Sequence, residues 1–174
     1  YLARIGGIEA LGTIDPALLA NSNLSLTGAG AAFYGSNSPT AIRQAALRIR
    51  DIVTRIAQVS DGAVLFNCTA GKDRTGIVAA LLLGLAGVSE AEIIEDYVLT
   101  EQMIPDLVAE FLSISRANGG DVARYATLLE SPADTMAKML SHLSEQYGGV
   151  EDYLLHSGVI RSDLLRLQER LCGA

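Results

Sequence analysis

A cysteine and an arginine separated by five residues form the stretch of this sequence best suited to chemistry. The stretch begins at Cys68 and reads CTAGKDRTG, after an apolar run over 64–66 and before a strongly apolar helix pattern. A thiolate is the nucleophilic form of cysteine, and a helix N-terminus with nearby cations lowers the thiol pKa from about 8.5. Arg74 carries a planar guanidinium that can bind two phosphate oxygens at once. The sequence therefore predicts a nucleophile and an anion site built from the same few residues.

The backbone of this loop is suited to bind the oxygens of a phosphate group. Successive amides over 69–74 can curl into a nest, and Gly71 lets the nest close without a side chain in the way. Thr75 would place a hydroxyl in the first turn of the following helix, within reach of the sulfur. We expect catalysis by Cys68, Arg74 and Asp73. We expect substrate binding by Thr69, Ala70, Gly71, Lys72, Thr75 and Gly76.

The loop resembles the signature of the cysteine-based phosphatases, in which Cys-x5-Arg is followed by Ser or Thr and then Gly. Its form is similar to that of the bacterial tyrosine, dual-specificity and phosphoinositide phosphatases. The segments 93–97 (IIEDY) and 147–154 (YGGVEDYL) resemble the helical second half of that family, and the resemblance spans about residues 38–172. It implies a phosphocysteine intermediate on Cys68 and phosphoryl binding by Arg74. It also associates Lys72 with extra phosphates of lipid headgroups and Asp73 with protonation of the leaving group.

Several residues keep alternative interpretations. Lys72 could be a solvated lysine at a loop tip, and Asp73 could be a helix N-terminal carboxylate that stabilises the helix dipole. Asn67 stands where the family usually has histidine; it can donate hydrogen bonds to loop carbonyls but cannot carry charge. Tyr97 is expected to pack against a helix with a free hydroxyl end.

The function that follows is a phosphoric monoester hydrolase that needs no metal or other cofactor. Phosphotyrosine, phosphoprotein and phosphoinositide substrates are all compatible with the loop, and inorganic phosphate is the expected product. The alternative is a phosphatase-like module that binds phosphorylated ligands with weak turnover or none, which Asn67 motivates. A nucleotide-binding loop is excluded, because Phe66 stands where its first glycine is required. Localisation stays open between cytoplasmic and secreted.

Composition limits the other classes of function. The chain has 174 residues, 49% of them hydrophobic, which favours one domain over 1–174 with a substantial core. Its net charge of −7 argues against nucleic-acid binding. The longest apolar run, over 77–88, suits a buried helix better than a membrane span of about 20 residues. Cys68 and Cys172 form neither a disulfide framework nor a metal-ligand spacing.

The expected fold class is α/β, with a cysteine-phosphatase-like central sheet flanked by helices and a helix-rich C-terminal half. We divide the domain into an irregular segment (1–37), a helix–strand–loop–helix core (38–87) and a helical half (88–174). The strand is expected over 63–66. Ser38 and Pro39 indicate the start of a helix with apolar spacing over 42–56, and Ser89 and Glu92 predict a capping box for a helix from 90. Apolar spacing and capping residues predict further helices from 74 to about 86 and over 104–117, 122–129, 132–147, 151–155 and 163–172. No segment before 38 matches the family's N-terminal part, so we expect some of the family domain to be missing.

Overall fold

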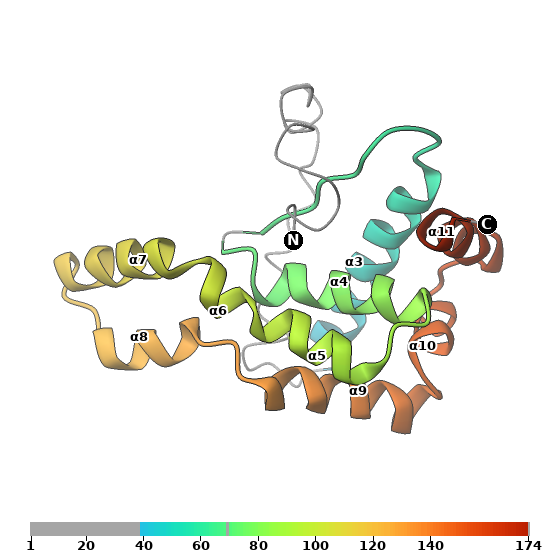
Figure 1. Cartoon of the computed structure of the whole chain (residues 1–174). Helices are drawn as coiled ribbons and strands as arrows, with labels where there is room; N and C mark the ends of the chain where they lie inside the picture. The colour runs from blue at the N-terminus through green and yellow to red at the C-terminus, as the bar shows by residue number, and fades with distance from the viewer. Residues whose placement is uncertain (1–38, 69, 174) are drawn as a thin grey trace.

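The computed structural model describes residues 39–68 and 70–173, so the predicted irregular segment 1–37 lies outside the described residues. The described part is helical, and Figure 1 shows α4 among α3, α5, α9, α10 and α11. In chain order the helices are α3 (Pro39–Gln58), α4 (Asp73–Leu85), α5 (Glu90–Val98), α6 (Thr100–Met103), α7 (Pro105–Ala117), α8 (Val122–Leu129), α9 (Ala133–Tyr147), α10 (Val150–His156) and α11 (Arg161–Cys172).

From Ile77 to Leu85 helix α4 is apolar on every side and mostly buried, which is typical of a helix at the centre of a fold. One cluster of buried side chains joins α4 to α3, α10 and α11 and includes Val53, Leu81, Leu154 and Leu164. A second cluster joins α4 to α5 and α9. Helix α4 follows the loop that begins at Cys68, called the cysteine loop below. It is therefore held by packing from several directions.

The predicted central sheet is wrong, because the described residues contain no strand. Residues 63–66, predicted as a buried strand, have no regular structure. A strand requires a neighbouring strand to pair its N–H and C=O groups, and within the described residues no segment pairs with this one. Phe66 is only partly buried and packs against the edge of the first cluster. The apolar run therefore leads into the loop without belonging to a sheet.

The C-terminal helix holds the segment that leads to the cysteine loop. Arg170 on α11 donates one hydrogen bond to the carbonyl of Val59 at 2.5 Å and another to the carbonyl of Gly62. These contacts join residues more than a hundred positions apart in the sequence. They fix the path of the chain between α3 and α4 in the absence of strand pairing there.

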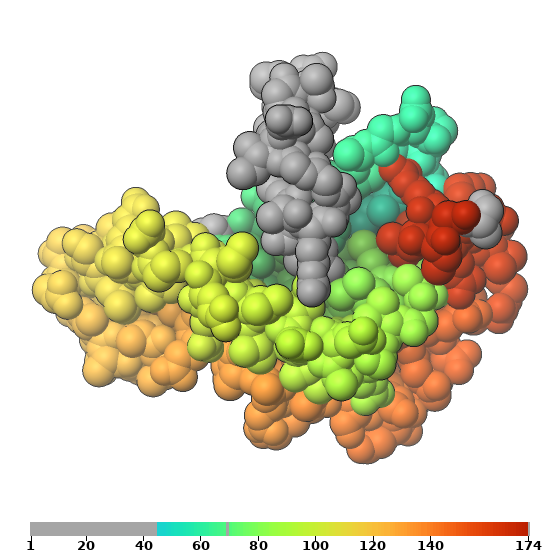
Figure 2. All heavy atoms as spheres, in the orientation of Figure 1, coloured from blue at the N-terminus to red at the C-terminus, as the bar shows by residue number. Residues whose placement is uncertain are grey.

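Helices α7 and α8 form a hairpin that extends away from the rest of the described molecule (Figures 1 and 2). Helix α7 has no buried residue, and Ile114 and Leu128 are about half exposed. The two ends of the hairpin return to the body at α6 and α9. Within residues 39–68 and 70–173, the structure has no helix that combines the length and the apolar character of a membrane span.

Several helix ends follow the local signals in the sequence. Ser89 and Glu92 form the expected capping box at the start of α5. Gly148 ends α9 in the left-handed conformation, with φ +92°. Pro39 is the first residue of α3, where a missing N–H costs nothing.

Candidate active site

The turn before α4 brings backbone N–H groups to the sulfur of Cys68. Gly71 adopts φ +66°, a left-handed conformation that strains other residues. Helix α4 begins two residues later, and the N–H groups of its first turn have no acceptor within the helix. The N–H groups of Gly71 and Thr75 lie close enough to the sulfur to lower the pKa of the Cys68 thiol. The nucleophile candidate therefore lies at the positive end of a buried helix.

The surroundings of Cys68 favour its ionised form. Burial raises the pKa of the thiol, but the hydroxyl and N–H of Thr75 lower it by hydrogen bonding. The positive charge of Arg74 and the N–H of Gly71 lower it further, and the net pKa lies below the ordinary value. The Thr75 hydroxyl oxygen is buried and makes no hydrogen bond of ordinary geometry within the described residues, so the nearby sulfur is the acceptor left to it.

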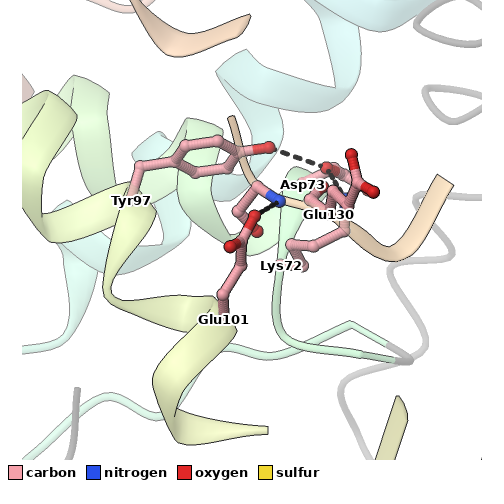
Figure 3. A network of polar contacts seen from close by, with 6 residues as sticks. Lys72, Asp73, Tyr97, Glu101 and Glu130 are labelled. Carbon is pink, nitrogen blue, oxygen red and sulfur yellow. Dashed lines mark hydrogen bonds and ion pairs between the residues drawn. The ribbon is translucent and has the colours of Figure 1, made fainter. Parts of the chain in front are cut away.

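Lys72 is buried rather than placed at an exposed loop tip. Its side chain is 5% exposed, and its ammonium group donates to Oδ1 of Asp73 at 2.7 Å and to the carbonyl of Glu130 at 2.8 Å (Figure 3). Glu130 is the residue that ends α8. The lysine therefore connects the cysteine loop to the link between the α7–α8 hairpin and α9.

Asp73 receives a second hydrogen bond from α5. The hydroxyl of Tyr97 donates to Oδ1 of Asp73 at 3.0 Å, so the expectation of a free hydroxyl end is wrong (Figure 3). The ring of Tyr97 lies directly against Gly76, where an added Cβ would be 2.9 Å from the ring. Gly76 thus allows α5 to approach the first turn of α4 closely enough for this contact.

A hydrogen bond joins the two ends of the α7–α8 hairpin next to the contacts of Lys72 and Asp73. The backbone N–H of Ser131 donates to a carboxylate oxygen of Glu101 on α6 (Figure 3). Ser131 follows Glu130, whose carbonyl accepts from Lys72. The segment entering the hairpin, the segment leaving it and the cysteine loop therefore share one connected set of polar contacts.

The sequence of the chain matches the model of the tyrosine phosphatase family over residues 16–173. The chain belongs to the tyrosine phosphatase family. The resemblance inferred from the loop is thereby confirmed. Among similar proteins, a tyrosine-protein phosphatase of Nostoc commune is 40% identical over 133 residues, which cover 71% of this chain and 44% of the relative. The triple specificity protein phosphatase PtpB of Mycobacterium tuberculosis is 29% identical over 126 residues, covering 63% of this chain and 44% of that protein.

A putative tyrosine-protein phosphatase of Cupriavidus necator is 31% identical over 110 residues, covering 62% of this chain and 40% of the relative. The chain thus spans less than half of the length of each of these curated relatives. The shared family places the Cys-x5-Arg loop in the context of phosphatases.

In this member of the tyrosine phosphatase family, the predicted site residues fall into two groups. The first group surrounds the sulfur of Cys68 and consists of Gly71, Arg74 and Thr75. The side chains of Lys72 and Asp73 contact each other and the neighbouring helices, while Gly76 faces α5. The remaining two predicted binding residues are Thr69, which lies outside the described residues, and Ala70, which is half-buried in the turn.

Asn67, in the position usual for histidine, is exposed, and its side-chain amide donates to the carbonyl of Cys68 at 3.4 Å. Within the described ranges, no group of three or more His, Cys, Asp or Glu side chains could hold a metal ion. The sequence did not predict the contact of Tyr97 with Asp73, which lies 24 positions earlier in the chain. No local pattern could have indicated this contact, because it depends on how α5 packs against α4.

Proposed function

We propose that this chain is a cysteine-dependent phosphoric monoester hydrolase that acts on phosphotyrosine in proteins. The observation that carries the proposal is the position of Cys68 in the loop before α4, where Arg74 and the N–H groups of Gly71 and Thr75 lower the pKa of its thiol. A thiolate is stabilised there by the helix dipole and by Arg74. The same donors suit the oxygens of a phosphate group bound at the helix end.

The first step would transfer the phosphoryl group to sulfur. The Cys68 thiolate forms an S–P bond as the P–O bond of the ester breaks. Asp73 enters this step as the carboxylic acid, and its proton passes to the leaving oxygen. Arg74 and the loop amides stabilise the charge that develops on the three phosphoryl oxygens. The enzyme then holds a phosphocysteine, and the dephosphorylated tyrosine leaves.

The second step would return the enzyme to its starting form. Asp73, now a carboxylate, accepts a proton from water as the water oxygen bonds to phosphorus and the S–P bond breaks. Inorganic phosphate and the Cys68 thiolate are the products. All groups in this scheme come from the loop and the first turn of α4.

Phosphoinositides are the second class of substrate to consider. Their extra phosphate groups need an additional cation, and Lys72 is the residue that the family resemblance associates with this role. Its ammonium group contacts Asp73 and the carbonyl of Glu130 and is almost fully buried. We therefore propose phosphotyrosine as the substrate class, because its hydrolysis needs no contact from Lys72 beyond these.

The test is phosphate release from an aryl phosphate and from a phosphotyrosine peptide, with a metal chelator present. Wild-type turnover that is absent in Cys68→Ser, while the variant still binds inorganic phosphate, is the expected result. Turnover by Cys68→Ser near the wild-type rate would refute the mechanism. A folded wild-type protein that binds phosphate without turnover would instead support the binding-module alternative.

A further inference from the structure

The contacts of Asp73 suggest how its carboxylate is positioned. Its Oδ1 atom accepts a hydrogen bond from the Tyr97 hydroxyl at 3.0 Å and one from the Lys72 ammonium at 2.7 Å. The two donors reach it from different parts of the fold, since Lys72 belongs to the loop and Tyr97 to α5. A carboxylate held from two directions has few alternative rotamers.

Tyr97 is itself firmly fixed. Its side chain is 5% exposed and belongs to the buried cluster formed by α4, α5 and α9. The ring contacts Gly76 one turn along α4 from Asp73, at a distance that leaves no room for a methyl group. The hydroxyl is therefore presented to Asp73 by a rigid ring, and packing alone would be served equally well by phenylalanine.

We propose that Tyr97 is a positioning residue for the reaction, which holds Oδ1 of Asp73 so that the other carboxyl oxygen, which carries the proton in the first step, faces the leaving-group oxygen. The proposal rests on the role of Asp73 as general acid in the proposed function. Orientation matters for proton transfer because the donor must come within hydrogen-bond distance of the oxygen that it protonates. Loss of the tyrosine hydroxyl should therefore affect substrates in proportion to their need for a proton.

The experiment compares two aryl phosphates in the full chain. One releases an acidic nitrophenol, which leaves without protonation, and the other releases phenol, which needs a proton. Tyr97→Phe should lower kcat for phenyl phosphate by about tenfold and for the nitrophenyl ester by less than about twofold, with KM little changed. Tyr147→Phe is the matched control, because Tyr147 packs against Tyr153 in another part of the core, and it should change neither value.

A second comparison tests whether the hydroxyl acts through Asp73. In an Asp73→Asn background, Tyr97→Phe should cause no further loss, because residues that act as a unit are not additive. The proposal would be overturned if Tyr97→Phe lowered kcat equally for both substrates, or if it lowered kcat just as much in the Asp73→Asn background. Loss of the native fold in Tyr97→Phe would also overturn it.

Failure of the proposed function would look different. Cys68→Ser with wild-type turnover would remove the cysteine mechanism, whatever Tyr97→Phe does. Cys68→Ser without turnover, combined with an Asp73→Asn loss that is equal on both substrates, would keep the cysteine and reject Asp73 as the acid. That outcome would overturn the role of Tyr97 as well.

Discussion

Replacing Lys72 with methionine tests whether this lysine is an anchor of the cysteine loop. Methionine keeps the length and the apolar part of the side chain and removes the ammonium group. Two hydrogen bonds would be lost, one to Asp73 at 2.7 Å and one to the carbonyl of Glu130 at 2.8 Å. Hydrogen bonds that involve a charged group contribute about 1.5–3 kcal/mol each, and burial of the methionine offsets part of the loss. We expect the free energy of unfolding to fall by about 3 kcal/mol.

The assay is urea unfolding followed by circular dichroism, without substrate, so that any contact between Lys72 and a phosphate plays no part. Lys138→Met is the control, because its ammonium also pairs with a carboxylate, that of Asp134 at 2.5 Å. That lysine is 76% exposed, and exposed pairs contribute little to stability. Equal stability of the two variants would refute the anchoring role and return Lys72 to solvent or to substrate binding.

Two further predictions concern the loop and the helix behind it. Because the pKa of Cys68 is lowered by the Thr75 hydroxyl among other groups, its thiolate persists below the ordinary thiol range. Thr75→Val should raise the pKa of Cys68 and slow its alkylation by iodoacetamide at pH 7 by about tenfold. The measurement uses a Cys172→Ser background, so that Cys68 is the residue alkylated. An unchanged pH profile of alkylation would show that the Thr75 hydroxyl does not act on the sulfur. Gly76→Ala should reduce the free energy of unfolding by about 1–3 kcal/mol, because the added methyl group would press against the Tyr97 ring. A fully stable Gly76→Ala variant would mean that α5 does not approach α4 as closely as described.

The helical part of the fold could be predicted because its signals are local. The capping box of Ser89 and Glu92 and the glycine at 148 mark helix ends by contacts within a few residues. The apolar stretch that became α4 also has the length and composition of a buried helix. The loop could be predicted for the same reason, since its cysteine, glycine and arginine lie within seven consecutive positions of the chain.

Two features could not be predicted from the sequence: the absence of a partner strand for 63–66 among the described residues, and the contacts that join Lys72, Asp73 and Tyr97. An apolar run such as 63–66 becomes a strand only beside another strand, and composition alone cannot supply that partner. Lys72 reaches a carbonyl 58 positions away, and Tyr97 reaches Asp73 across 24 positions. Each contact follows from the packing of α5 and α9 on α4, so the residues could be named from the sequence but their partners could not.

In the proposed mechanism, Cys68 carries the phosphoryl group during turnover. The most direct measurement is peptide mass spectrometry of the full chain after acid quenching during turnover of an aryl phosphate. We predict a phosphorylated peptide in which the modification lies on Cys68, and no such peptide in Cys68→Ser. Steady turnover with phosphate found on another residue, or turnover that survives without Cys68, would contradict the account.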